Sequence, residues 1–314
     1  MRLLAIAALS LSLVGCNRNA VEAVNRFNEG NQAKKSGNLD EAASKYDQAS
    51  KLDPSNHRIH WGLCTIAQAR ENWEKVAEHC KNAARASEMD GMKKKAPSFA
   101  NYYALWGYAE RQLASKGQAQ WGDAKEPLQT AIKIDPNLPG PYADLGEVSL
   151  HLDEEAAALQ NFTKAIETKP TDLDAYVSLV ELYSDLGYDK EAEAVLKEGL
   201  SFAGDSKSDD PRIQRHIFNL RSRAGSLKEM KGDTKGALAD YEAAKKLCGQ
   251  CNERGQQIAY FNLGSALVKD GQKEQGIALL KSFNKVVCKG SAKKNFDVEC
   301  DQTMEIVSKA GGTL

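Results

Sequence analysis

The sequence predicts an all-α protein built from stacked helix pairs. A pattern of small, large and proline residues recurs about every 34 residues between Asn25 and Cys288. A clear copy is Tyr142-x2-Leu145-Gly146…Ala158-x3-Phe162-x2-Ala165-x4-Pro170. A period of this length is typical of arrays in which each helix pair stacks on the next. Gly37 falls where a pair needs a tight turn, and Pro54 falls where a second helix must end.

Small residues are expected where the two helices of a pair cross closely, because bulky side chains there would force the helices apart. On the first helices these positions hold Gly30, Gly107, Gly146, Gly225 and Gly264. On the second helices they hold Ala42, Ala124, Ala158, Ala192 and Ala237. The large residues that would fill the space between pairs are Tyr46, Leu128, Phe162, Leu196, Tyr241 and Leu280.

These positions and the period together resemble the tetratricopeptide repeat. The resemblance implies an all-α, right-handed solenoid of about seven helix pairs over residues 23–290, and a generic helical bundle is the alternative. The expected pairs occupy residues 23–56, 57–90, 100–138, 139–172, 173–206, 218–251 and 257–290. The third pair carries an insertion around 116–120, which one extra turn in its first helix would absorb. The connections 91–99 and 207–217 are expected to be partly helical.

The residues after the last pair, 291–314, are expected to form a capping helix and tail. A solenoid must cover the apolar face of its final repeat. A helix over residues 297–309 offers four apolar side chains for that purpose: Val298, Met304, Ile306 and Val307.

The first 15 residues have the composition of a secretory signal peptide. An apolar run over 3–14 follows Arg2 and is too short for a permanent transmembrane helix. It ends in Leu13-Val14-Gly15-Cys16, which resembles the bacterial lipobox. The resemblance implies cleavage before Cys16, a diacylglyceryl thioether on its sulfur, and a fatty acyl chain such as palmitate on its amino group. An ordinary signal peptide with an unmodified cysteine is the alternative.

The segment 16–22 is expected to be a short linker between the lipid and the first helix. Asn17, where an aspartate would favour inner-membrane retention, favours the outer membrane by resemblance, with the protein on its periplasmic face. About five residues reach less than about 20 Å, so the first pair is expected close to the membrane. The chain has 42 Lys and Arg against 43 Asp and Glu, and losing Arg2 gives a net charge of −2. This balance argues against a nucleic-acid partner.

Six further cysteines are expected to form disulfides, because an exported protein folds in an oxidising compartment. The repeat places Cys64 and Cys80 on facing positions of one pair, so their bond is the firmest expectation. The expected local bonds are Cys248–Cys251 and Cys288–Cys300, although Cys248 and Cys288 could exchange partners.

Two chemical alternatives apply to these cysteines. Cys248 and Cys251 form a CxxC motif that could be redox-active, but the motif falls at a helix C-terminus, where the dipole disfavours a thiolate. Cys64 and Cys80 have metal-compatible spacing with three histidines, His57, His60 and His79. Because oxidation would remove both thiolates, no metal or other cofactor is expected.

By resemblance to tetratricopeptide-repeat proteins, the first helices line a concave groove that binds a peptide or helix. Its N-terminal end would be basic and aromatic, with Phe27, Asn31, Lys34, Arg58, Trp61, Tyr108 and Arg111. Its middle would be acidic, with Glu147, Asp174, Glu181 and Asp185, and its far end would hold Glu229, Phe261 and Val268. Trp61 and Tyr108 are the best candidates for binding, unless they pack against a neighbouring helix. Only Asn31 fits the carboxylate clamp of chaperone-tail binders.

The sequence favours a binding protein over an enzyme. It has no nucleophile elbow, phosphate-binding loop, HExxH motif or glycine-rich dinucleotide motif. Together, the lipobox and repeats resemble pilotins and the adaptors of peptidoglycan hydrolases. We therefore expect an adaptor that assists a pilus secretin, a cell-wall enzyme or motility machinery. A self-associating structural lipoprotein, for example a homodimer, is the alternative.

Overall fold

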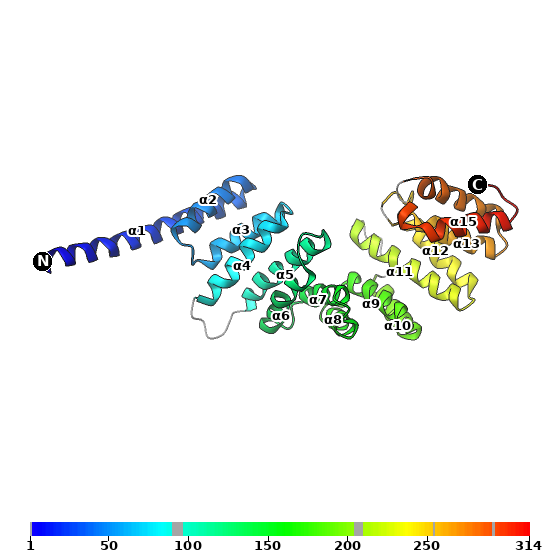
Figure 1. Cartoon of the computed structure of the whole chain (residues 1–314), viewed down its shortest axis with the longest axis horizontal. Helices are drawn as coiled ribbons and strands as arrows, with labels where there is room; N and C mark the ends of the chain where they lie inside the picture. The colour runs from blue at the N-terminus through cyan, green and yellow to red at the C-terminus, as the bar shows by residue number, and fades with distance from the viewer. Residues whose placement is uncertain (1, 90–96, 204–209, 254, 291–292) are drawn as a thin grey trace. The chain divides into compact units, whose positions relative to one another are not determined.

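The described part of the protein is entirely helical. The computed structural model describes residues 2–89, 97–203, 210–253, 255–290 and 293–314, with side chains from Arg18 onward, and no strand occurs in these ranges. The chain divides into two compact units, unit 1 (Met1–Thr168) and unit 2 (Lys169–Leu314) (Figure 1). The predicted all-α repeat fold is confirmed. No helix of the described ranges is both long enough and apolar enough to cross a membrane.

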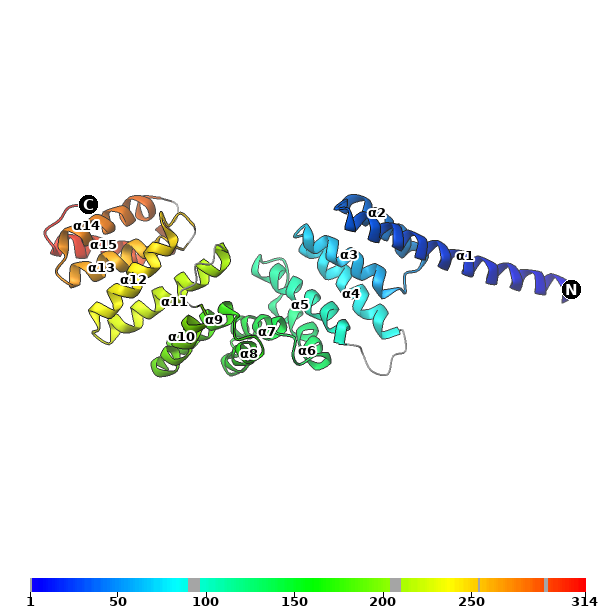
Figure 2. The same ribbon diagram turned by 180° about the vertical axis from the view of Figure 1, so that it is seen from behind.

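Unit 1 contains four helix pairs. The first two are α1 (Arg2–Lys35) with α2 (Leu39–Leu52) and α3 (His57–Ala69) with α4 (Trp73–Met89). The third comprises η1 (Pro97–Phe99), α5 (Ala100–Ser115), η2 (Trp121–Ala124) and α6 (Lys125–Ile134), and the fourth comprises α7 (Gly140–His151) and α8 (Glu155–Thr168). The two helices of each pair pack against each other (Figures 1 and 2).

Unit 2 contains three pairs and a terminal helix. The pairs are α9 (Leu173–Asp185) with α10 (Asp189–Ala203), α11 (Pro211–Met230) with α12 (Thr234–Cys248), and α13 (Ile258–Lys269) with α14 (Lys273–Phe283). The π-helical turn η3 (Asn284–Cys288), η4 (Lys293–Asn295) and α15 (Asp297–Lys309) follow.

Close packing inside the pairs follows the small and large positions of the repeat. A Cβ atom on Gly30 would lie 2.6 Å from ring carbons of Tyr46, and one on Gly146 would lie 2.7 Å from ring carbons of Phe162. The Tyr46 ring also lies against Gly62 of the next pair, at 2.8 Å from its ideal Cβ position. One aromatic side chain therefore packs both within its pair and against the following pair.

The turns and helix ends also follow the sequence pattern. Gly37 and Gly187 have φ angles of 81° and 77°, the left-handed conformation that glycine adopts without steric cost. Asp53, which precedes Pro54, ends α2 with φ −139° and ψ 79°, outside the helical region. The backbone thus turns or stops where the repeat predicts.

Three segments have more helix than a plain repeat. Helix α1 is continuous from Arg2, so residues 18–22, expected as part of a linker, are helical, and the side chain of Cys16 lies outside the described residues. Helix α5 continues for eight residues after Gly107, whereas α7 continues for only five after the equivalent Gly146, so α5 has the extra turn expected for the insertion. The 3-10 turn η2 contains the rest of the inserted residues. Helix α11 includes the expected helical residues 211–217; residues 91–96 and 207–209 of the two connections lie outside the described ranges.

Helix α15 packs against α13, α14 and η3, as expected for a cap. Its buried face consists of Cys300, Thr303 and Val307. Val298 and Met304, expected to be buried, have exposed fractions of 65% and 51%. The reason is helical phase: the Cys288–Cys300 disulfide turns the face at positions 300, 303 and 307 inward, and Val298 and Met304 lie off that face.

The structure contains the three disulfides that the sequence favours. The Cα–Cα distances are 5.2 Å for Cys64–Cys80, 4.6 Å for Cys248–Cys251 and 5.6 Å for Cys288–Cys300. The bond between Cys64 and Cys80 joins α3 to α4 in the core of the second pair. Within the described ranges, no three His, Cys, Asp or Glu side chains are grouped as metal ligands.

We predict that Gly276→Ala destabilises unit 2 by about 1–3 kcal/mol, the usual cost of overpacking. A Cβ at this position would lie 2.6 Å from the Gly264 carbonyl oxygen and 2.9 Å from the Val268 nitrogen, and backbone atoms cannot rotate away. All four tryptophans precede residue 122, so far-UV circular dichroism detects unfolding of both units, whereas tryptophan fluorescence reports on unit 1. The urea midpoint measured by circular dichroism should move to lower concentration. The midpoint measured by tryptophan fluorescence should stay unchanged.

The matched control is Gly140→Ala at the start of α7, where a Cβ would meet no atom within 4 Å. It should change neither transition measurably. Equal effects of the two substitutions would contradict close backbone approach as the reason for Gly276.

Candidate functional site

In unit 1, the residues predicted at the N-terminal end of the groove contact other side chains of the fold. The Asn31 side-chain oxygen accepts a hydrogen bond from the Tyr46 hydroxyl at 2.8 Å, and the Phe27 ring lies 5.6 Å from the Tyr46 ring. The Lys34 ammonium donates to the Thr65 hydroxyl at 2.6 Å, and partial burial lowers the pKa of Lys34. These residues hold α1 to α2 and α3.

Trp61 and Tyr108, the expected centres of binding, are half-buried against neighbouring aromatic rings. The centroid of Trp61 lies 4.8 Å from that of Tyr102, and the centroid of Tyr108 lies 5.4 Å edge-on from that of Trp73. The structure thus gives both residues the packing role that was the alternative for them. Arg58 remains exposed on α3.

Arg111 is neutralised by acidic residues of the neighbouring first helix. Its Nε lies 3.0 Å from Asp144, and its guanidinium donates to Glu147. The side chains of Arg111 and Asp144 are only 13% and 16% exposed. Burial alone lowers the pKa of Arg111, but the attraction of Asp144 and Glu147 outweighs it, so the net pKa is raised. Arg111 and Glu147, both predicted to contact a partner, instead bind each other and join α5 to α7.

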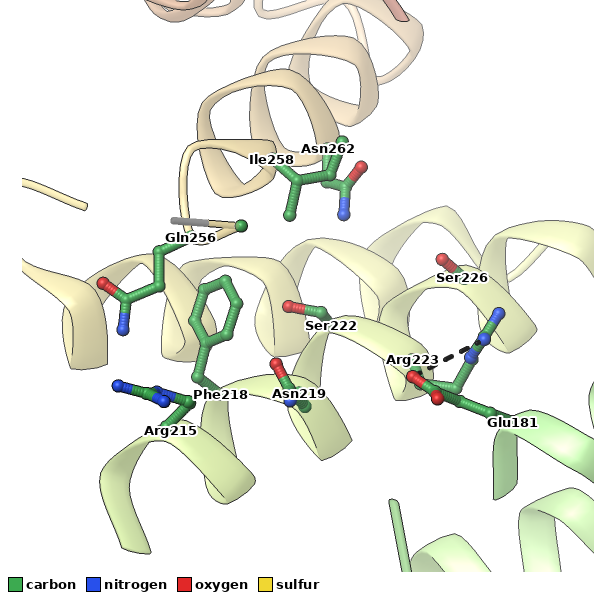
Figure 3. Close-up of a pocket in the computed structure, with 11 residues that line it drawn as sticks. Glu181, Arg215, Phe218, Asn219, Ser222, Arg223, Ser226, Gln256, Ile258 and Asn262 are labelled. Atoms are coloured by element: carbon green, nitrogen blue, oxygen red, sulfur yellow. Dashed lines mark ion pairs between the residues drawn. The ribbon is translucent and has the colours of Figure 1, made fainter. Parts of the chain in front are cut away.

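In unit 2, the first helices enclose a pocket of about 440 Å³, which we call the α11–α13 groove (Figure 3). It lies between α11, α13 and the C-terminal part of α9. Its lining residues are Glu181, Arg215, Phe218, Asn219, Ser222, Arg223, Ser226, Gly255, Gln256, Ile258 and Asn262. Of the groove residues predicted from the sequence, Glu181 lies here.

The long wall of this groove is one face of α11. Residues 215, 219, 222 and 226 recur every three or four positions and therefore project from the same side of the helix. Asp210 caps the helix by accepting from the Arg212 backbone N–H at 2.9 Å, and Pro211 occupies the first turn. These wall residues were not predicted. Arg215 lies in the segment 207–217, which the repeat pattern leaves as a connection. Residues 219, 222 and 226 lie within the sixth pair, but their helical spacing alone does not distinguish them from the other residues of a helix.

The charges at the rim of the α11–α13 groove are paired. The Arg215 guanidinium lies 3.0 Å from Glu253, and that of Arg223 lies 4.0 Å from Glu181 (Figure 3). Partial burial raises the pKa of Glu181, Arg223 opposes this, and Asp185 and Asp174 add to it. Among the described residues of the rim, each of the two arginines is therefore paired with a carboxylate.

The interior of the groove presents uncharged polar groups over an apolar floor. Asn219 and Asn262 supply amides from opposite helices, and the buried ring of Phe218 forms the floor (Figure 3). The Ser222 hydroxyl is shielded from solvent and has no hydrogen-bond partner among the described residues. Amides and hydroxyls both donate and accept hydrogen bonds, so these groups match ligands with both functions.

An adjoining pocket of about 520 Å³ shares Arg223, Ser226 and Asn262 with the groove and continues toward α15. It also contains Phe261, predicted for the far end, and the exposed Met230. Glu229, another predicted residue, lies here and pairs with Lys269.

The other predicted residues of unit 2 do not line either pocket. Asp174 lies 3.6 Å from the ring nitrogen of His216, and Asp185 is exposed at the end of α9. Val268 packs beside Gly276 at the crossing of α13 and α14.

Comparison with known proteins gives the same architecture. Residues 173–206 match the tetratricopeptide repeat. The chain has a tetratricopeptide-repeat fold. No curated protein matches the sequence.

Three solved structures illustrate the likeness. The C-terminal part of a repeat-containing protein from Cytophaga hutchinsonii shares 16% identity over 86% of this chain and 98% of its own, with a TM-score of 0.58. A tetratricopeptide repeat protein from Parabacteroides merdae shares 16% identity over 90% and 99%, with a TM-score of 0.54. PilF of Pseudomonas aeruginosa shares 17% identity over 73% and 93%, with a TM-score of 0.51. At these identities the likeness establishes the fold alone.

We predict that Arg111→Gln destabilises unit 1 by about 2 kcal/mol, because it removes the buried guanidinium charge that joins Asp144 and Glu147 to α5. The urea transition followed by tryptophan fluorescence should move to lower concentration. The control is Arg70→Gln, the same exchange in an ion pair whose partner Asp40 is 95% exposed, and it should cost less than about 0.5 kcal/mol. A stability loss at Arg70 as large as that at Arg111 would contradict burial as the cause.

Proposed function

We propose that this protein is a non-catalytic adaptor of the bacterial envelope that binds a segment of another envelope protein in the α11–α13 groove. The observation that carries the proposal is the chemistry of that groove. Asn219 and Asn262 line one pocket together with Phe218, and the Ser222 hydroxyl lacks a partner among the described residues. Binding sites in proteins commonly combine an apolar floor with a few convergent polar groups.

The groove chemistry favours an extended peptide segment as the ligand. Each peptide unit offers one N–H donor and one carbonyl acceptor, and the Asn219 and Asn262 amides can satisfy both. Among the described residues, Arg215 pairs with Glu253 and Arg223 pairs with Glu181, so these four side chains together carry no net charge. Recognition would therefore depend on main-chain hydrogen bonds and apolar contact.

The proposed location is the outer membrane, on its periplasmic face, with the lipid on Cys16. Support comes from the Leu13–Cys16 lipobox and from the three disulfides, which fit an oxidising compartment. Residues 18–22 are helical, so at 1.5 Å per residue Ala23 would lie about 10 Å along the axis from Cys16. An adaptor held this close to the membrane suits the assembly or localisation of a pilus secretin, a cell-wall enzyme or motility machinery.

Self-association is the second candidate function, favoured by one observation. Val298 and Met304 are exposed on α15, and uncovered apolar side chains at the end of an array can pack against another copy. In that case the delipidated protein would dimerise in sedimentation experiments, and the double substitution of Val298 and Met304 by serine would abolish the dimer.

The direct test is photocrosslinking of the full-length protein in its own cells. A photoreactive residue at Asn219 or Asn262 should capture one envelope protein, whereas one at Glu242, exposed on α12, should not. Only self-adducts would favour the structural alternative. No adducts at the two groove positions, or equal capture at all three positions, would refute groove binding.

We further predict that the captured segment, made as a peptide, binds the purified protein with little dependence on salt. Because the rim charges are paired, the dissociation constant should change less than about threefold between 50 and 500 mM NaCl. Asn262→Ala should weaken binding about tenfold, which corresponds to about 1.4 kcal/mol for hydrogen bonds lost in a sheltered site. Isothermal titration calorimetry measures both effects, with Glu242→Ala as control. A steep salt dependence would contradict recognition through uncharged groups.

A further inference from the structure

We propose that the Cys248–Cys251 disulfide is a positioning device for the α11–α13 groove, because it fixes both a wall and the floor of that pocket. This inference rests on the proposed function in one respect: one of its two tests measures partner binding. Cys248 is the last residue of α12, and the loop that follows it leads into the groove wall.

The disulfide fixes the exit of the chain from α12. Cys251 has a φ of 49°, a left-handed conformation that a residue with a side chain rarely adopts. Its backbone N–H donates to the Cys248 carbonyl at 2.8 Å, so a hydrogen bond and the S–S bond close the same turn. The Lys245 ammonium also donates to the Gly249 carbonyl at 2.5 Å. The chain therefore reverses directly after the helix.

The floor of the groove packs against this turn. Cys251 is buried in a cluster with Phe218, Ala244 and Ala259. Phe218 is the same aromatic residue that lines the groove together with Asn219. The half-cystine thus lies in the hydrophobic cluster that supports the Phe218 ring, and a cysteine free to leave this position would remove part of that support.

The wall of the groove is formed by the residues that leave this turn. The Tyr260 hydroxyl donates to the Gln250 carbonyl at 3.1 Å, and the Gln257 amide donates to the Asn252 carbonyl at 3.3 Å. Beyond them, Glu253 pairs with Arg215 across the rim, and Gln256 lines the pocket. Each of these contacts depends on where the loop begins, which the disulfide fixes.

A positioning role also fits the local electrostatics better than thiol exchange. Cys248 lies at the C-terminal end of α12, where the helix dipole disfavours a thiolate. The disulfide encloses a sequence separation of only 3, against 16 for Cys64–Cys80, so its contribution to global stability is expected to be the smaller. Its loss should affect the groove more than the fold.

The test compares two disulfide-free variants of the full-length protein. Cys248→Ala/Cys251→Ala removes the proposed device. Cys288→Ala/Cys300→Ala removes the bond that joins α15 to η3, in a neighbouring hydrophobic cluster that shares only the partly buried Tyr260 with the cluster of Cys251. Each variant also carries the photoreactive residue at Asn219. We expect the first variant to lose at least tenfold in capture of the partner and the second to capture it as the unsubstituted protein does.

Hydrogen exchange of the purified chain provides a readout that needs no partner. In the first variant, the amides of residues 250–253, 255–257 and 215–222 should exchange at least tenfold faster while far-UV circular dichroism is unchanged. In the second variant these amides should keep their protection. If the first variant captures the partner at position 219 as well as the protein with both cysteines does, this inference is overturned and the proposed function stands. If neither variant nor the protein with all its cysteines captures a partner, the proposed function is overturned. In that case, unchanged hydrogen exchange in the first variant would separately overturn the inference. Equal losses in both variants would show general loosening and also overturn it.

Discussion

The close crossing of paired helices is the constraint on which the rest of the structure depends. Tyr46 fits only because Gly30 and Gly62 have no Cβ atoms on either side of its ring. In the fifth pair the two helices exchange these roles: the large residue, Tyr176, lies on the first helix, α9, and packs over Gly199 on the second helix, α10. The crossing therefore requires a large residue on one helix and a glycine on the other, and either helix can carry the large residue. This close approach is what places the first helices side by side and creates a groove between them.

Charge pairing between neighbouring first helices removes most of the electrostatic character that the groove would otherwise have. Arg111 is held by Asp144 and Glu147, and Lys269 by Glu229. A charged side chain that is half-buried at a helix junction loses hydration, and an opposite charge on the next helix compensates for that loss. The charges that appear as a pattern along the sequence thus join helices together, and the uncharged amides and hydroxyls between them are left to meet a ligand.

The fold could be predicted from the sequence because its determinants are local and periodic. Gly37, Pro54 and the Cys64–Cys80 pair each act within one repeat, so the register of the repeat is enough to place them. The groove could not be predicted in the same way. Whether Trp61 faces solvent or packs on Tyr102 depends on side-chain positions across two helices, which periodicity does not specify. The exposure of Val298 similarly depends on the phase of α15, which the Cys288–Cys300 bond sets.

Departures from the repeat identify the groove better than agreement with it does. A repeat array gives every pair similar contacts, so a specific site requires something that the other pairs lack. Helix α11 has extra turns before residue 218, and these supply Arg215, which extends the wall that Phe218 and Asn219 begin. The loop closed by Cys248 and Cys251 is equally peculiar to its place, and its residues face that same extension through Glu253 and Gln256. Two independent irregularities, one before the sixth pair and one after it, thus form opposite sides of one pocket. Their coincidence is the structural reason to place the proposed binding site in this groove.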